Sequence, residues 1–201
     1  MDNHSEIKFL LDDAVNQYNR IDFIKDDPVQ IPHLFESKED IEIAGFLSAT
    51  IAWGIRKSII KNCLKLMELM NHSTYDFLMD EDFLIQYKTE INRFVHRTFN
   101  CEDCFFFLKS LQNIYKNHGG LEQVFTDGFQ IDKTIFSALK HFRSIFLEIP
   151  HSKRAEKHLS DVVSNSSAKR LNMFLRWMVR SDANGVDFGL WKNIPMSALM
   201  L

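Results

Sequence analysis

Residues 166–180, SSAKRLNMFLRWMVR, have the apolar spacing of an amphipathic α-helix. The predicted buried stripe comprises Leu171, Phe174, Leu175 and Met178. Either Ser166 or Ser167 is a natural N-cap, because a side-chain hydroxyl at that position can accept from a free backbone N–H group. The same stretch carries the fixed cations Lys169, Arg170, Arg176 and Arg180. We therefore expect a helix with one face in the core and a concentration of positive charge outside it.

Helical spacing recurs in every long apolar segment of the 201-residue chain, and the sequence has no sustained strand-like alternation. Eighteen Phe against seven Gly and four Pro favour large side chains packed between helices. The spacing predicts helices near residues 5–20, 38–54, 55–70, 104–117 and 132–148, with shorter pieces at 74–79 and 82–92. A basic turn or helix at 153–159 and a polar turn at 164–168 then lead into the helix described above. We predict an all-α fold, one helical unit over residues 1–201 with a hairpin near 153–180.

The cysteines and histidines do not form a recognisable metal site. Cys101-x-x-Cys104 has no second Cys or His pair to complete a tetrahedral zinc site. His151 and His158 could share a helix face, but acidic partners at ligand spacing are absent. The N-terminus is acidic where a signal peptide requires cations, and no apolar run approaches the length of a membrane span. We predict a soluble, cytoplasmic protein with reduced thiols, no metal, no cofactor and no membrane partner.

Charge is distributed unevenly along the chain, although the formal net charge is only −3. Residues 1–50 contain eleven acids and four bases, a balance of −7. Residues 151–180 contain seven bases and two acids, a balance of +5. This polarity suggests one face that meets an anion while the rest of the protein stays soluble. The alternative is that the basic run is an ordinary solvated helix surface.

Lys169 falls in the first turn of its predicted helix, where the helix dipole favours anions over cations. A phosphate could bridge the amine and the free N–H groups, which is one way to grip a nucleic-acid backbone. An amine held in a partly desolvated pocket can instead lose its proton and become a nucleophile that forms Schiff bases. A solvated Lys169 without a ligand is the third possibility. GxSxG, P-loop and HExxH signatures are absent, which excludes several common kinds of catalytic site.

The segment Lys169-Arg-Leu-Asn-Met-Phe-Leu-Arg176 resembles the start of the second hairpin helix in helix-hairpin-helix DNA glycosylases, notably the archaeal 8-oxoguanine glycosylases. In those enzymes a catalytic Lys is followed by a small or polar residue and then by Phe-Leu-Arg. The resemblance places Lys169 on the catalytic Lys and Asn172 on the small or polar position. It implies a glycosylase-like helical bundle. The turn before Lys169 departs from the pattern, because it reads Ser-Asn-Ser-Ser-Ala where the glycosylases prefer glycines.

Most of the chain also resembles a bacterial family known as domain of unknown function 2400. The resembling stretches are Ala44 to Arg56 with its Trp53-Gly54, His96-Arg-Thr-Phe99, and Arg170 to Arg180 followed by Asp187-x-Gly-Leu-Trp191. Family members continue into a Pro-Leu-Asp-Thr-His segment, whose Asp is the counterpart of the glycosylases' catalytic Asp. The resemblance therefore implies kinship with the glycosylases. It also leads us to expect that residues 1–201 are a C-terminally truncated piece.

These observations lead us to expect binding of damaged or abasic double-stranded DNA, with base excision. The resemblance implies that Lys169 attacks the sugar C1′ of a flipped nucleotide and forms a Schiff base. The predicted DNA-binding residues, along a groove bordered by residues 56–61, are Lys153, Lys157, Ser166, Ser167, Arg170 and Arg176. Trp53 is the candidate for base stacking, with a packing role as the alternative. The rival functions are a non-catalytic DNA-binding or scaffolding module of the same fold, and a helical protein whose basic face meets RNA or an acidic protein.

Overall fold

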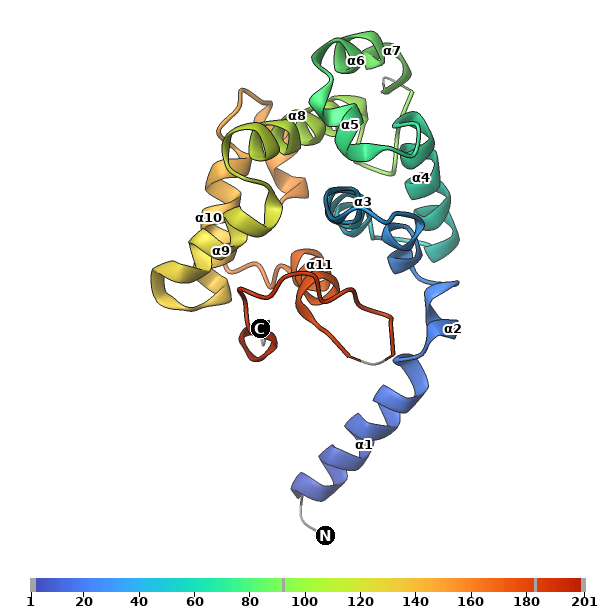
Figure 1. Cartoon of the computed structure of the whole chain (residues 1–201), viewed down its shortest axis with the longest axis vertical. Coiled ribbons are helices and arrows are strands. Elements are labelled where there is room, and N and C mark those ends of the chain that lie inside the picture. Colours follow the sequence, from blue (N-terminus) through green and yellow to red (C-terminus); the bar gives the residue numbers. More distant parts are fainter. Residues whose placement is uncertain (1–2, 92, 183, 200–201) are drawn as a thin grey trace.

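The computed structural model describes residues 3–91, 93–182 and 184–199, and the regular secondary structure of these residues is entirely helical (Figure 1). The α-helices are α1 (Asn3–Tyr18), α2 (Ile21–Ile24), α3 (Lys38–Thr50), α4 (Arg56–Leu69), α5 (Thr74–Met79), α6 (Glu81–Gln86), α7 (Lys88–Ile91), α8 (Cys101–Asn117), α9 (Leu121–Asp132), α10 (Ile135–Phe146) and α11 (Lys169–Val179). The 3-10 helices are η1 (Pro28–Gln30), η2 (Pro32–Leu34), η3 (Lys153–His158) and η4 (Met196–Leu199). Extended pairing in this part of the chain is limited to an isolated bridge between His96 and Phe99. The predicted all-α fold class is confirmed.

Helix α3 lies at the centre of the fold. The Ser37 hydroxyl caps it by accepting from the Asp40 N–H at 3.2 Å, and every residue from 41 to 50 is buried. Figure 1 shows α3 end-on, with α4, α5, α8 and α11 arranged around it. Gly45 allows α11 to approach closely, because an added Cβ would lie 3.3 Å from Met178 Cε and 3.4 Å from Phe174 Cε2. Helix α11 is therefore held directly against the central helix.

Phenylalanine rings fill the space between α3 and its neighbours. The centroid of Phe46 on α3 lies 6.2 Å from Phe107 of α8, 5.5 Å from Phe142 of α10 and 5.7 Å from Phe174 of α11. The contacts with Phe142 and Phe174 are edge-to-face, the arrangement that aromatic pairs prefer over a face-to-face sandwich. All of these rings are buried. The high Phe content thus forms one aromatic core shared by four helices.

Helix α9 lies in a stretch where the sequence led to no predicted helix. It packs along α10 at Gly128, where an added Cβ would lie 2.6 Å from His141 Cβ and 2.8 Å from Ala138 Cα. Glycine lowers intrinsic helix propensity, which weakens the local signal for α9. The same glycine allows the two helix backbones to approach closely. Tertiary packing therefore stabilises a helix that local spacing does not reveal.

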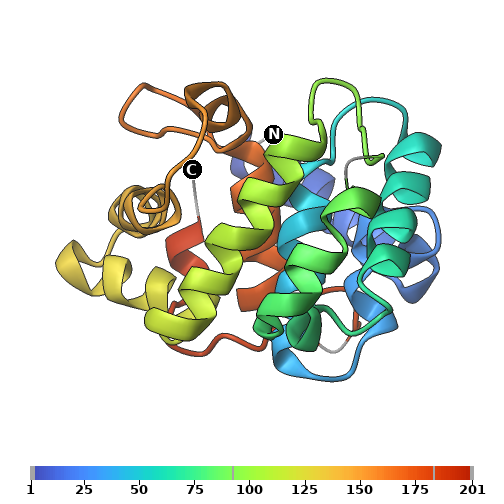
Figure 2. The same ribbon diagram turned by 90° about the horizontal axis from the view of Figure 1, so that it is seen from above.

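The segment before α11 differs in detail from the predicted hairpin. The stretch predicted as its first helix is the 3-10 helix η3, and Figure 2 shows residues 147–168 at one edge of the molecule, beside the starts of α8 and α11. We predicted Ser166 or Ser167 as the N-cap of α11, and this prediction is wrong. The N-cap is Ala168, which is left-handed at φ 47° and makes no side-chain cap. The Ser166 hydroxyl instead accepts from the Ala168 N–H at 3.2 Å, so it is used within the turn.

Helix α1 projects away from the other helices (Figure 1). Its C-terminal end is fixed by Asn19, whose side-chain amide donates to Asp182 Oδ2 at 2.8 Å and whose oxygen accepts from Arg180. Tyr18 also makes an edge-to-face contact with Phe23. Over the described ranges, no helix combines the length and the apolar character needed to cross a bilayer.

Candidate functional site

Three segments singled out in the sequence meet at the C-terminal end of α3. Arg170, in the first turn of α11, places its guanidinium carbon 4.7 Å from the centroid of the Trp53 ring. The guanidinium donates to the carbonyl of Thr50 and, at 3.3 Å, to that of His158. Burial lowers the pKa of Arg170. This cation is therefore held by the protein through a cation–π contact and two carbonyls.

Two histidines also contact Trp53. His158 stacks on the indole with a centroid distance of 5.7 Å, and His96 meets it edge-on at 5.0 Å. The Asn62 side-chain nitrogen donates to His96 Nδ1 at 2.9 Å, so His96 Nε2 carries the proton that is donated to the Trp53 carbonyl at 3.1 Å. Burial lowers the pKa of both His96 and His158, which favours the neutral imidazoles. Trp53 and these neighbours thus form one packed group. We call it the Trp53 cluster; its members are Trp53, His96, His158 and Arg170.

A buried carboxylate connects the Trp53 cluster to α8. Asp103 is 2% exposed, and its Oδ1 accepts from Arg154 Nη1 at 2.6 Å. Asp103 Oδ2 lies 3.2 Å from His158 Nε2 and accepts from the Asn100 N–H at 2.9 Å. The carboxylate therefore fixes η3 against the start of α8. No local spacing relates Asp103 to His158 or Arg154, but the capping-box spacing of Asn100 and Asp103 is a signal that identifies Asp103.

An exposed arginine lies beside the Trp53 cluster. Arg97 has a left-handed backbone at φ 54°, and its guanidinium lies against Gly54. An added Cβ at Gly54, itself at φ 108°, would come within 2.6 Å of Arg97 Nη1. Glycine at position 54 thus makes room for a cation at the end of α3. Arg56 follows two residues later at the start of α4, exposed and 3.9 Å from Asp27.

Lys169 is exposed at the start of α11. The helix start has no side-chain cap, so its free N–H groups and the ammonium lie in the same region of the surface. Among the residues whose placement is described, no hydrogen bond or ion pair involves Lys169. We considered partial burial as a means of activating this amine. That expectation is wrong, because the Lys169 side chain is exposed. Its catalytic role stays a prediction.

The remaining predicted site residues occupy two different surroundings. Lys153 and Lys157 are exposed on η3, and Ser166 and Ser167 are exposed in the turn before α11. Arg176 instead pairs with the buried carboxylate of Asp187 at 3.2 Å. It also borders a separate hollow beside α1. Arg176 is therefore engaged by the C-terminal segment, whereas the side chains of the two lysines and the two serines face solvent.

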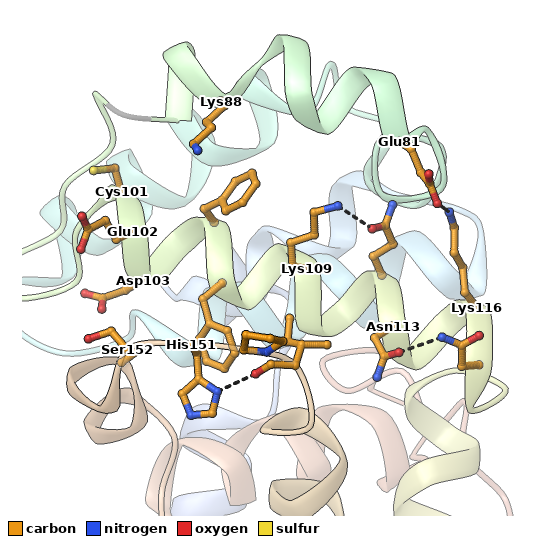
Figure 3. Close-up of a pocket in the computed structure, with 17 residues that line it drawn as sticks. Glu81, Lys88, Cys101, Glu102, Asp103, Lys109, Asn113, Lys116, His151 and Ser152 are labelled. Atoms are coloured by element: carbon orange, nitrogen blue, oxygen red, sulfur yellow. Dashed lines mark hydrogen bonds and ion pairs between the residues drawn. The ribbon is translucent and has the colours of Figure 1, made fainter.

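A hollow of about 690 Å³ runs along α8, between α6–α7 and residues 149–155 (Figure 3). Lys88 Nζ lies 5.4 Å from the centroid of Phe105, and His151 stacks on Phe106 at 4.5 Å. Lys109 donates to Gln112, and Lys116 pairs with Glu81. Asp103, whose carboxylate lies against His158, also lines this hollow. The hollow therefore adjoins the Trp53 cluster. The lining also contains the carboxylates of Glu81, Glu102 and Asp103, so charge alone does not select a ligand for this hollow.

Comparison with known proteins identifies the family but no characterised relative. No curated protein and no solved structure matched the chain. The family model that matches covers residues 27–201, which includes the Trp53 cluster, Asp103, η3 and α11 and excludes α1. With most of its length matched, the chain belongs to the family described as Protein of unknown function (DUF2400).

Proposed function

We propose that the chain binds double-stranded DNA, damaged or abasic, at the surface formed by Lys153, Lys157, Ser166, Ser167 and Lys169, here called the basic edge. The observation that carries this proposal is the exposed Lys169 at a helix start without a side-chain cap. Free backbone N–H groups and a cation together form a ready site for a phosphate. The exposed lysines of η3 extend the same positive region. Such contacts grip the DNA backbone without reading its sequence.

The Trp53 cluster connects the segments that carry the basic edge. Arg170 reaches the carbonyls of Thr50 and His158, so it joins the start of α11 to α3 and to η3. Asp103 joins η3 to α8 through Arg154. These bonds fix the spacing between Lys157 and Lys169, which matters because phosphates are spaced regularly along a duplex. We therefore assign a positioning role to Arg170, in addition to the direct contact predicted from the sequence.

We further propose that Lys169 acts as the nucleophile of a base-excision reaction, in keeping with the glycosylase resemblance of residues 169–176. The neutral amine attacks the sugar C1′, the bond from C1′ to the base breaks, and the base leaves with the bonding electrons and acquires a proton. One of the two amine protons goes to the departing base; the bond from C1′ to the ring oxygen then breaks, the ring oxygen takes the second amine proton, and C1′ and the nitrogen become joined by the double bond of a Schiff base. The amine must first lose its ammonium proton. Asp187 is not its partner, because this carboxylate is paired with Arg176 and Arg180.

A non-catalytic DNA-binding module is the second candidate. The observation that favours it is the solvent exposure of Lys169 together with the absence, in the described portion of the chain, of a carboxylate paired with it. Attack requires a group that takes a proton from the amine, and none is paired with Lys169 in the described residues. The two candidates share the basic edge and differ only in the chemistry of one amine.

Borohydride trapping tests the catalytic proposal. The full chain is incubated with undamaged, abasic and 8-oxoguanine duplexes in the presence of borohydride, which reduces a Schiff base to a stable covalent adduct. We expect an adduct with a damaged duplex that is lost in Lys169→Gln while duplex binding, measured by fluorescence anisotropy, decreases only modestly. Lys140→Gln is the matched control, since Lys140 is an exposed lysine on α10. Duplex binding without trapping supports the non-catalytic module, and no binding to any duplex contradicts both candidates.

A further inference from the structure

Arg97 lies in a tight turn that the contacts proposed above do not include. The His96 N–H donates to the Phe99 carbonyl at 2.8 Å, and the Phe99 N–H donates to the His96 carbonyl at 2.9 Å. Arg97 and Thr98 therefore form a two-residue turn, and of the two only Arg97 has a positive φ, at 54°. The first position of such a turn usually carries Gly, Asn or Asp when its φ is positive. Arg97 thus occupies a backbone conformation that its side chain disfavours.

The guanidinium of Arg97 lies against a glycine and faces solvent. An added Cβ at Gly54 would come within 2.6 Å of Arg97 Nη1, so the side chain is in close contact with this backbone. Arg97 is exposed, and in the part of the chain that the structure describes no hydrogen bond or ion pair involves its guanidinium. A strained backbone persists only where the surrounding structure fixes it, and residues of this kind cluster at functional sites. Neither the turn nor the core requires an arginine here, so the side chain is available to a ligand at the surface.

The turn lies directly beside the basic edge. Arg154 of η3 donates through Nη2 to the Thr98 carbonyl at 2.7 Å, so a single side chain spans from the turn to η3. The Phe99 ring also contacts His158, at the end of η3, with a centroid distance of 5.0 Å. Figure 2 shows the segment that leads into α8 at the same edge of the molecule as the segment between α10 and α11. A duplex that lies on the lysines of η3 would therefore pass Arg97.

We propose that Arg97 binds a backbone phosphate of this duplex, an inference that rests on the proposed DNA binding and extends the binding surface to the end of α3. A guanidinium holds phosphate oxygens through two parallel N–H groups, whereas a lysine ammonium acts as a point charge. A two-pronged contact of this kind requires a fixed orientation. The hydrogen-bonded turn and the close contact with Gly54 supply that orientation. Since the contact is with the backbone, it is the same for damaged and undamaged DNA.

Fluorescence anisotropy with an undamaged duplex, over a series of salt concentrations, tests Arg97→Gln and Arg97→Gly in the full chain. We expect both variants to raise the dissociation constant and to reduce the slope of log affinity against log salt by about 0.9, as the loss of one phosphate contact does. Arg20→Gln is the matched control and should leave the slope unchanged. Arg20 is exposed and follows Asn19, which is bonded to Arg180 at the opposite end of α11 from Lys169.

Arg97→Gly separates a DNA contact from a role in the fold. Glycine adopts a positive φ without steric cost, so the Tm followed by circular dichroism should not decrease in this variant while its affinity for the duplex does. A decrease in Tm with wild-type affinity would show that the side chain serves the stability of the turn, and would overturn the proposal.

The remaining outcomes distinguish this proposal from the proposed function. A wild-type salt slope in Arg97→Gln, while Lys153→Ala still weakens binding, would overturn the role of Arg97 and leave the basic edge in place. An equal change of slope in Arg97→Gln and Arg20→Gln would indicate a general effect of charge, and would also overturn it. A wild-type chain that binds no duplex would overturn this proposal and the proposed function together.

Discussion

At the scale of single residues, His158 couples the folded state to pH. Burial lowers the pKa of His158 from its usual 6.5 and outweighs the opposing attraction of Asp103. The folded protein therefore binds fewer protons than the unfolded chain, so this contribution to stability is present above pH 6.5 and is lost as the pH falls through the lower folded pKa. We expect the Tm, followed by circular dichroism, to decrease on acidification below pH 6.5, and to decrease less steeply in His158→Gln.

The control for this measurement is His72→Asn. His72 is exposed and has a left-handed backbone at φ 52°, which Asn tolerates. His96 also has a lowered pKa, so His158→Gln should reduce the pH dependence without removing it. The same slope of Tm against pH in wild type and His158→Gln would contradict the assignment.

The sequence identified some residues of this site and missed others for a physical reason. Trp53, His96 and Arg170 stand in stretches that resemble a known family, so each was singled out. Asp103 and Arg154 are 51 positions apart, and no local spacing relates them. Sequence spacing also cannot give the exposure of the Lys169 side chain, because exposure depends on which elements pack over the start of α11. For this reason the expected partial burial of Lys169 was wrong.

At the scale of elements, local spacing predicts the buried faces of the helices. It does not predict where a helix begins or how closely two helices pack at a glycine. The buried stripe of α11 is as predicted, whereas its start is set by the turn that precedes it. Asn172 contributes to that turn by donating to the Ser167 carbonyl at 3.1 Å. Asp161 also accepts from the Val163 N–H at 3.0 Å and from the Ser164 hydroxyl at 2.9 Å. These polar contacts stabilise the turn itself. An N-cap rule considers only contacts with the first N–H groups of the helix, so it does not include them.

Gly128→Ala tests the contact between α9 and α10. In an isolated helix Ala is favoured over Gly, so propensity alone predicts a gain in stability. The added Cβ would lie 2.8 Å from the Ala138 backbone, which cannot move without shifting α10. We expect overpacking to dominate, with a loss of about 1–3 kcal/mol in the free energy of unfolding measured in urea. Gln130→Ala, on the exposed side of α9, should change this free energy little; a stabilised Gly128→Ala would show that the helices have room to separate.

At the scale of the whole molecule, the fold class follows from the sequence but the arrangement of the helices does not. Helical spacing and Phe content are local properties, and both predicted an all-α protein. The contacts that fix the C-terminal segment are long-range: Trp191 Nε1 donates to Glu42 Oε1 at 2.7 Å across 149 positions. Burial raises the pKa of Glu42, while the Tyr115 hydroxyl donates to its other oxygen at 2.7 Å. Pairings of this kind depend on the completed fold, and an isolated sequence pattern cannot reveal them.

The uneven charge of the chain leads to a prediction about the whole molecule in solution. Lys153 and Lys157 are exposed on η3, in the basic edge, and neither has an ion-pair partner in the described residues. If both contact phosphates, replacing them by Ala should weaken binding to every duplex, damaged or not, by a similar factor. Each lost phosphate contact should also reduce the slope of log affinity against log salt by about 0.9. Fluorescence anisotropy over a series of salt concentrations measures both quantities.

Lys140→Ala on α10 provides the comparison, since it removes an exposed lysine outside the basic edge. A general effect of net charge would weaken binding to a similar extent in Lys140→Ala, Lys153→Ala and Lys157→Ala, because each removes one positive charge. Direct phosphate contacts would change the salt slope only in the two η3 variants. An equal slope in all three variants would therefore remove η3 from the binding surface. A loss confined to damaged duplexes would instead place these lysines at the lesion rather than along the DNA backbone.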